Sequence, residues 1–373
     1  MTAFWAILTC FIMFFQNIFS LGAASGSLER ETKLLKDRKE ILAAKYSGEP
    51  SEDVFDPSAA FDADEVFTLE KQPDRDFVIL NITDTHFSDY DYRTLFAFDA
   101  ERTIEKLAKQ YSPDLITVTG DIVCGDSTKG AIERFTALMD SIGVPWAPVY
   151  GNHDDEANCD LNYLADVMLT SEYCLFKKGD PAMGCGNYII NITENGRVVE
   201  TVFMTDSHHS QLNSTQVGWF RWAADGLREA GRLGETSVFF HIPLPEYQYA
   251  YDAAWDADKK VWLPEFDAGG KLNEKICCER DAEGNPVQRG VFAALKDAGT
   301  SYIFCGHEHM NDFSIMYDGI RMTYCLKVDK ASGYQPGFDG GTVIRIGSDG
   351  IKSITHRTVS GIDRDIMNIK TGK

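Results

Sequence analysis

The stretch LITVTGDIVCGD, Leu115–Asp126, contains a short apolar strand that ends at a glycine and is followed at once by an aspartate. A carboxylate at the tip of a buried strand costs free energy unless a metal ion or another cation lies beside it. Cys124, three residues after Asp121, is a second candidate ligand. The stretch therefore predicts a buried strand that ends in a metal site, with Asp121 as its first ligand.

Similar apolar runs alternate with helical segments from Asp76 onward, which is typical of an α/β domain. The runs that predict strands are FVILNIT, LITVTG, WAPVYG, YIINIT, VVETVFMT, SVFFHIP, YIFCGH, FSIMY, IRMTYCL and GTVIRIG. The spacing predicts helices over about 94–111, 129–142, 215–231 and 288–298. Turns at Asn195-Gly196, Asp318-Gly319 and Asp349-Gly350 predict hairpins, so we expect mixed sheets.

Five of the predicted strands end in residues of the types that bind metals. The ends are Asp84 and His86, Asp121, Asn152 with His153 and Asp154, His241, and His307 with His309. In an α/β sheet the carboxyl ends of strands share one edge, where sites are built. A single such residue is more often a packed, hydrogen-bonded side chain, but five strand ends of this kind indicate a site.

The mixture of carboxylate, amide and imidazole groups suits two divalent ions such as Mn, Zn or Fe. One aspartate can bridge two ions about 3.5–4 Å apart, the arrangement used for displacement at phosphorus. Gly120, Gly151 and Gly306 precede ligands and are expected to let the backbone approach the site closely.

These blocks, DTH, GD, GNHD, a lone histidine after an apolar strand, and GHEH, resemble in order those of the calcineurin-like metallophosphoesterases. The resemblance covers residues 77–360. FFHIPLPEY, VFAALKDAG and CGHEHMNDF are similar to the purple-acid-phosphatase-like branch of plants and fungi. The resemblance implies an α/β fold of two mixed β-sheets packed as a sandwich and flanked by helices.

The resemblance also implies a role for each ligand. The first metal would be held by Asp84, His86 and His309, and Asp121 would bridge to the second. The second metal would be held by Asn152, His241 and His307. His153 would protonate or stabilise the leaving oxygen, with Asp154 orienting its ring.

In the purple branch a tyrosine takes the position of Cys124, and the first block lacks the histidine. Since His86 can fill the vacated coordination position, we expect Cys124 not to be a ligand and the enzyme to be colourless.

Among neighbouring residues, Tyr90 and Tyr92 could line the opening through which substrate enters, and His208 or His209 could reach the phosphate. For each of these residues the alternative is a surface position without a role in the site. The long segment 252–289 could cover the site.

The resulting hypothesis is a secreted phosphoesterase that hydrolyses phosphate monoesters by attack of a hydroxide bridging two metals. A phosphodiesterase or nucleotide pyrophosphatase on the same metal core is the alternative enzyme. A non-catalytic binding protein that retains the fold is the alternative of another class. Loss of function normally removes Asp121, Asn152 or His153, and all three are present.

The net charge of −21 argues against a nucleic acid partner and leaves a small phosphorylated substrate as the expected partner.

Residues 1–24 carry no charged side chain and end in small residues, which predicts a signal peptide and secretion or residence in the secretory lumen. A signal anchor is the alternative, and no stable membrane insertion is expected. The predicted divisions are the signal peptide 1–24, an N-terminal extension and linker 25–75, the domain 76–360 and a C-terminal tail 361–373.

Eight cysteines follow the predicted signal peptide, and an even number in a secreted chain permits disulfides. A bridge is expected within the region from Cys159 to Cys185, while Cys277 and Cys278 are expected to pair with separate partners. Of three glycosylation motifs, Asn213 is the expected acceptor, because Asn81 lies in a predicted core strand.

Overall fold

The computed structural model describes residues 48–88, 99–125, 128–156, 160–329, 339–359 and 364–368. The chain divides into two compact units, Met1–Tyr46 and Ser47–Lys373, and every described residue lies in the second unit. The predictions made for residues 1–24, for Tyr90 and Tyr92, and for Cys159 fall outside the described residues.

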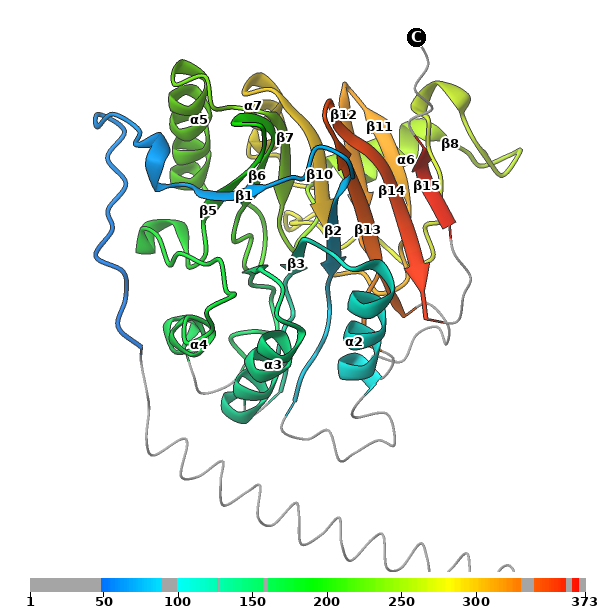
Figure 1. Cartoon of the computed structure of the whole chain (residues 1–373). Coiled ribbons are helices and arrows are strands. Elements are labelled where there is room, and N and C mark those ends of the chain that lie inside the picture. The colour runs from blue at the N-terminus through cyan, green and yellow to red at the C-terminus, as the bar shows by residue number, and fades with distance from the viewer. Residues whose placement is uncertain are drawn as a thin grey trace, which may run out of the picture. The chain divides into compact units, whose positions relative to one another are not determined.

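The fold has two large mixed sheets (Figure 1). The seven-stranded sheet has the order β1-β5-β6-β7-β10-β12-β11, and its strands β6, β7, β10 and β12 are parallel neighbours. Its strands are β1 (Phe67–Glu70), β5 (Tyr188–Glu194), β6 (Arg197–Met204), β7 (Glu235–Phe239), β10 (Thr300–Cys305), β11 (Ser314–Tyr317) and β12 (Ile320–Tyr324).

The six-stranded sheet has the order β15-β14-β13-β2-β3-β4. Its strands are β2 (Phe77–Ile82), β3 (Leu115–Thr119), β4 (Trp146–Val149), β13 (Gly340–Gly347), β14 (Gly350–Thr358) and β15 (Arg364–Asn368). Strands β2, β3 and β4 are parallel, whereas β13 runs antiparallel to β2. The carboxyl ends of β2, β3 and β4 therefore lie at one edge of this sheet.

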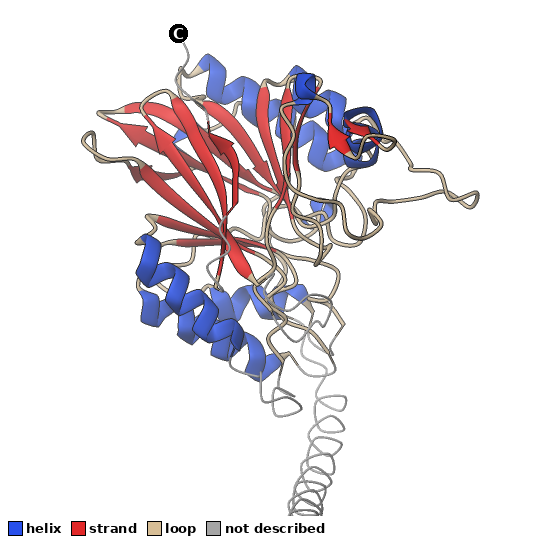
Figure 2. Ribbon diagram, turned by 90° about the vertical axis from the view of Figure 1, so that its right-hand side faces the viewer, coloured by secondary structure: helices blue, strands red, loops and turns tan. Residues whose placement is uncertain are grey.

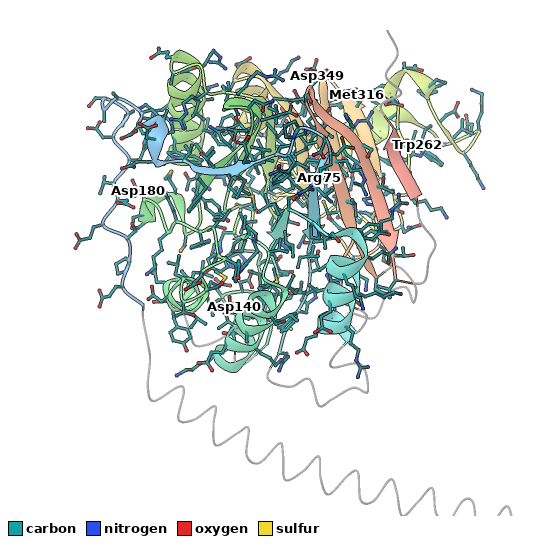
Figure 3. All side chains as sticks on the ribbon, viewed as in Figure 1. Arg75, Asp140, Asp180, Trp262, Met316 and Asp349 are labelled. Atoms are coloured by element: carbon teal, nitrogen blue, oxygen red, sulfur yellow. The ribbon has the colours of Figure 1, made fainter. Side chains whose placement is uncertain are left out.

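The two sheets share one hydrophobic core. Ile79 and Ile344 of the six-stranded sheet lie in the same buried cluster as Val202 and Phe239 of the seven-stranded sheet. Side chains fill the space between the ribbons (Figure 3). A second cluster joins the other face of the seven-stranded sheet to the helices that cover it. This is the predicted sandwich of two mixed sheets.

Helices cover the outer faces of the sandwich (Figure 2). The α-helices are α2 (Asp99–Tyr111), α3 (Lys129–Ile142), α4 (Leu161–Met168), α5 (Ser214–Glu229), α6 (Glu246–Ala254) and α7 (Val291–Asp297). The single-turn 3-10 helices are η1 (Ala63–Glu65), η3 (Pro181–Met183) and η4 (Pro264–Phe266). Helix α2 packs on β2 and β13, and α7 packs on β10. None of the described helices has the length and apolar character needed to cross a membrane.

All ten predicted strands and the three predicted hairpin turns are present: the turns connect β5 to β6, β11 to β12 and β13 to β14. The structure adds β14, which follows the third of these turns, and one strand in each of the two flanking segments. Strand β1 lies in the predicted linker and pairs with β5, and β15 lies in the predicted tail and pairs with β14. Both are short, and β1 alternates half-buried and exposed residues, so neither has the apolar run that marks a core strand.

The long segment after Asp252 contains the two-residue strands β8 (Trp255–Asp256) and β9 (Val261–Trp262), which pair as a small hairpin. Helix α6, which leads into this segment, was not predicted. Tyr247 on this helix is buried against Phe313 and Tyr324, so tertiary packing stabilises the helix.

The described cysteines, among them Cys185, Cys277 and Cys278, are free thiols.

Asn81 is buried and its amide donates to the Thr117 hydroxyl, in agreement with the expectation that it carries no glycan. Asn213 caps α5 through its side-chain oxygen, and its amide donates to the Ala182 carbonyl. Glycosylation of Asn213 stays a prediction.

Candidate functional site

The structure brings the predicted ligands from both sheets into two adjoining groups. Asp84, His86, Asp121 and His309 form one group, and Asp121, His241 and His307 form the other. Within each group the ligand atoms lie within 4.8 Å of one another. Asp121 belongs to both groups, which is the position expected of a bridging ligand.

Asp121 follows β3 and is almost completely buried. Its Oδ2 lies 3.2 Å from His241 Nε2 and 3.5 Å from His86 Nε2, and it has no hydrogen-bond partner. Its Oδ1 accepts the backbone N–H of His153 at 2.9 Å. Burial raises the pKa of Asp121, but the neighbouring imidazoles of His241 and His86 lower it more, so its pKa lies well below the ordinary value. The carboxylate is therefore charged and directed at positive groups.

Asp84 lies at the end of β2 and is held in one orientation. Its Oδ2 accepts the Thr83 hydroxyl at 2.8 Å and the backbone N–H of His307 at 3.1 Å. Its Oδ1 is buried without a hydrogen-bond partner, 3.3 Å from His309 Nε2. A buried carboxylate oxygen of this kind costs free energy unless a cation lies beside it.

His86 is positioned by a carboxylate that was not predicted. Its Nδ1 lies 3.6 Å from Asp329 Oδ2, while its Nε2 faces Asp121. A carboxylate on the far nitrogen commonly orients a metal-binding histidine and increases its basicity. Strand-end reasoning could not find Asp329, because it lies five residues beyond the end of β12 with Lys327 in between.

His241 is completely buried, and its Nδ1–H donates to the Thr119 carbonyl at 2.8 Å. Its Nε2 faces two oxygens, Asp121 Oδ2 and Asn152 Oδ1, each at 3.2 Å. Burial lowers the pKa of His241, but the Asp121 carboxylate raises it more, to about 9. The position attracts positive charge, which either a proton or a metal ion can supply.

His307 packs its ring against His241, with ring centroids 5.1 Å apart. Burial and the neighbouring His241 lower the pKa of His307 to about 4. Its imidazole is therefore neutral near pH 7, the form that binds metals.

The backbone at the site is strained, which fixes the ligands before any ion binds. Asp84, His86, Asp121 and His307 all have positive φ angles, from 46° to 79°, a region that non-glycine residues rarely adopt. A Cβ on Gly151 would lie 2.3 Å from Asp121 Oδ1, and one on Gly306 would lie 2.0 Å from the Thr83 hydroxyl. The close backbone approach predicted at these glycines is confirmed.

The residues fit two divalent cations. Buried, unpartnered oxygens of Asp84 and Asp121 face imidazole nitrogens, and oxygen and nitrogen donors are those that Mn, Zn and Fe accept. Cys124 lies beside the site, where its thiol donates to the His86 carbonyl, and burial raises its pKa to about 11.

His153 follows β4 and is the more exposed histidine of the centre, with 37% of its side chain accessible. Its Nε2 lies 3.9 Å from Asp121 Oδ2, and its Nδ1 lies 2.6 Å from Glu156 Oε1. The expectation that Asp154 orients this ring is wrong. Residues 152–155 form a turn, which brings His153 close to the residue three positions on instead of to its neighbour.

Asp154 is buried and binds backbone instead. Its carboxylate accepts the N–H groups of Gly151 at 2.7 Å and Val123 at 2.9 Å, so it connects the loops that follow β3 and β4. Burial and the nearby Asp121 raise the pKa of Asp154 to about 8. Its role in this geometry is to hold two ligand-bearing loops together.

These contacts predict opposite effects for two neighbouring substitutions. Asp154→Ala leaves two buried N–H groups unsatisfied and should lower the free energy of unfolding by about 1–3 kcal/mol. Glu156→Gln should leave the unfolding midpoint unchanged but lower the turnover rate, since the His153 ring loses its charged partner. Thermal unfolding and steady-state kinetics of both variants check this, and an unfolding midpoint lowered by Glu156→Gln alone would contradict it.

Segment 252–289 is attached beside the last two histidine ligands. Asn273 N–H donates to Asn311 Oδ1 at 2.9 Å, Met310 N–H donates to Glu274 Oε1 at 2.7 Å, and Cys277 N–H donates to the Glu308 carboxylate. The segment therefore borders the site at the end of β10. His208 and His209, for which contact with the phosphate was one of two alternatives, both contact Asp155.

The chain is similar to a known protein family over the part that carries the site. A family model described as Calcineurin-like phosphoesterase matches residues 77–311, a range that contains all the predicted ligands. In the solved structures, a dimetal phosphatase from Danio rerio is similar with a TM-score of 0.51 and 13% identity, over 79% of this chain and 99% of that chain. At this identity the likeness concerns the fold.

The chain is also similar to three curated relatives, whose names describe a phosphatase, an inactive purple acid phosphatase and a phosphodiesterase. Phosphatase DCR2 of Saccharomyces cerevisiae is 26% identical over 58% of this chain, and this chain spans only 39% of the yeast protein. Probable inactive purple acid phosphatase 28 of Arabidopsis thaliana is 25% identical over 69% of this chain and 71% of that protein. The cAMP/cGMP dual specificity phosphodiesterase MT0825 of Mycobacterium tuberculosis is 27% identical over 47% of this chain and 52% of that protein.

Proposed function

Because the chain belongs to the calcineurin-like phosphoesterase family, we propose that it is a secreted hydrolase of phosphate monoesters that uses two divalent metal ions. The observation that carries the proposal is the position of Asp121 in both ligand groups. Asp84, His86 and His309 would hold one ion together with Asp121, and Asn152, His241 and His307 would hold the other. Manganese, zinc and iron suit this donor set.

When bound, two such ions supply positive charge to a phosphoryl group and activate water as a nucleophile. His153 then provides the proton for the leaving oxygen. Its Nε2 faces the centre, its side chain is accessible to a substrate, and Glu156 holds the opposite nitrogen. Histidine suits this step because its ordinary pKa lies near neutral pH. Thr83 and the His307 backbone keep Asp84 in its orientation during turnover.

Monoester hydrolysis is supported by the name of the yeast relative, Phosphatase DCR2. The name of the mycobacterial relative supports diester hydrolysis as the second candidate on the same centre. Although the name of the plant relative includes the word inactive, this chain retains the bridging aspartate and the histidines of both groups. The uncharged, apolar residues 1–24 support the proposal that the chain enters the secretory pathway.

A paired assay tests the proposed activity. The purified full chain is treated with a chelator and then given Mn, Zn or Fe before assay on an aryl phosphate monoester and on the matching diester. We expect chelation to remove activity, added metal to restore it, and the monoester to be the preferred substrate. Preference for the diester would favour the second candidate, and inactivity on both substrates with every metal would favour a binding protein.

A further inference from the structure

A second cluster of metal-binding residue types consists of Asp155, His208 and His209. Asp155 is the last residue of the turn after β4, and the two histidines follow β6. His209 Nε2 lies 3.0 Å from Asp155 Oδ2, and His208 Nε2 lies 3.4 Å from the same oxygen. One ligand atom from each residue lies within 4.8 Å of the others. This histidine–aspartate cluster shares no residue with the two groups described above.

The spacing of these atoms suits a single metal ion. Zinc binds imidazole nitrogen and carboxylate oxygen at about 2.0–2.2 Å, which places neighbouring ligand atoms about 2.8–3.6 Å apart in octahedral or tetrahedral geometry. The two measured nitrogen–oxygen distances lie in this range. Two imidazoles and one carboxylate also match the donors preferred by zinc, iron and manganese.

An ion pair without a metal explains the cluster less well. The rings of His208 and His209 lie with centroids 4.1 Å apart and face the one Asp155 carboxylate, which can neutralise the charge of only one protonated ring. A metal ion bound to both rings requires neither of them to be a cation, because neutral imidazole is the form that binds metals.

The loop that carries the two histidines is held in place by buried neighbours. Asp206 accepts the His208 N–H at 2.8 Å and the Cys185 N–H at 3.0 Å. The Ser207 hydroxyl accepts the N–H groups of His241 at 3.1 Å and Ile242 at 2.9 Å. His208 itself has a positive φ of 47°, a strained conformation that these contacts stabilise. The histidines are therefore positioned before a ligand arrives.

We propose that Asp155, His208 and His209 bind an additional divalent transition-metal ion beside the dinuclear centre. Three protein ligands leave coordination positions open, as in zinc sites that bind a further small ligand. The side chains are 33%, 40% and 52% exposed, so these positions face solvent. The proposal does not depend on phosphoesterase activity, and its test measures metal content.

Zinc stoichiometry tests the site. The purified full chain and its variants are loaded with zinc, dialysed against metal-free buffer, and analysed for zinc per chain by mass spectrometry. Asp155→Asn and His209→Asn should each bind about one zinc ion fewer than the wild type. Asp258→Asn, which removes an exposed carboxylate elsewhere, serves as the matched control and should bind as much zinc as the wild type. Asp121→Asn should lose the dinuclear pair and keep the additional ion.

Thermal unfolding of the metal-free variants identifies any that fail to fold. Asp155→Asn replaces a half-exposed carboxylate by an amide of the same shape, so its unfolding should match that of the wild type. Wild-type zinc content in folded Asp155→Asn and His209→Asn would overturn the proposal. Loss of phosphoesterase activity with unchanged zinc content would likewise overturn it, because the residues would then act without a metal.

Discussion

Asp121→Asn should abolish phosphoester hydrolysis, with turnover reduced by about a thousandfold or more. The substitution replaces the one carboxylate common to both ligand groups by a neutral amide. Asp121 Oδ2 faces His241 and His86 without another partner, so an amide there removes the charge that would bind both cations. Metal analysis of the purified variant should show loss of both ions of the centre.

Asp114→Asn is the matched control for this experiment. Asp114 directly precedes β3, whereas Asp121 follows its carboxyl end, and the Asp114 carboxylate pairs with Arg75. The control should retain metal and activity. An Asp121→Asn variant that keeps both ions and wild-type turnover would show that the bridge has been assigned to the wrong residue.

His153→Ala should leave the metal content unchanged while lowering turnover by about a hundredfold to ten-thousandfold. The His153 ring lies at the accessible side of the centre, and its closest approach to Asp121 Oδ2, 3.9 Å, is longer than those of His241 and His86. Removing the ring therefore removes a proton donor without removing a ligand.

The leaving group distinguishes proton donation from substrate binding. An aryl phosphate with an acidic phenol needs little protonation, whereas an alkyl phosphate releases a strongly basic alkoxide. The loss in His153→Ala should therefore be larger on the alkyl substrate. Equal losses on both substrates would show that His153 binds the phosphate instead of protonating the leaving oxygen.

Much of the fold was predictable because its core strands are apolar. The strands β2, β3 and β7 are mostly or fully buried, and their sequences are dense in apolar and β-branched residues. Strand β1 could not be found in this way because it alternates half-buried and exposed residues, and β15 could not because it is only five residues long and lies at the edge of its sheet. Their presence in the sheets follows from pairing with β5 and β14.

The ligands were predictable for a related reason. A polar residue directly after a buried strand must lie at the sheet edge, and parallel strands bring such residues to the same edge. This reasoning led to Asp84, Asp121 and His241, and the structure places them together. Reasoning from strand ends could not identify Glu156 in place of Asp154 as the partner of His153, because the conformation of a turn decides which side chain reaches the ring.

By itself, the sequence determined which strands form the core and which residue types stand at their ends, because burial selects apolar side chains locally. Only the tertiary structure decided the contacts among residues far apart in the chain. Asp329 reached His86, and Asp155 met His208 and His209, through loops whose conformations depend on buried hydrogen bonds to other segments. Contacts of this kind arise from the packing of whole loops, and no short stretch of sequence encodes them.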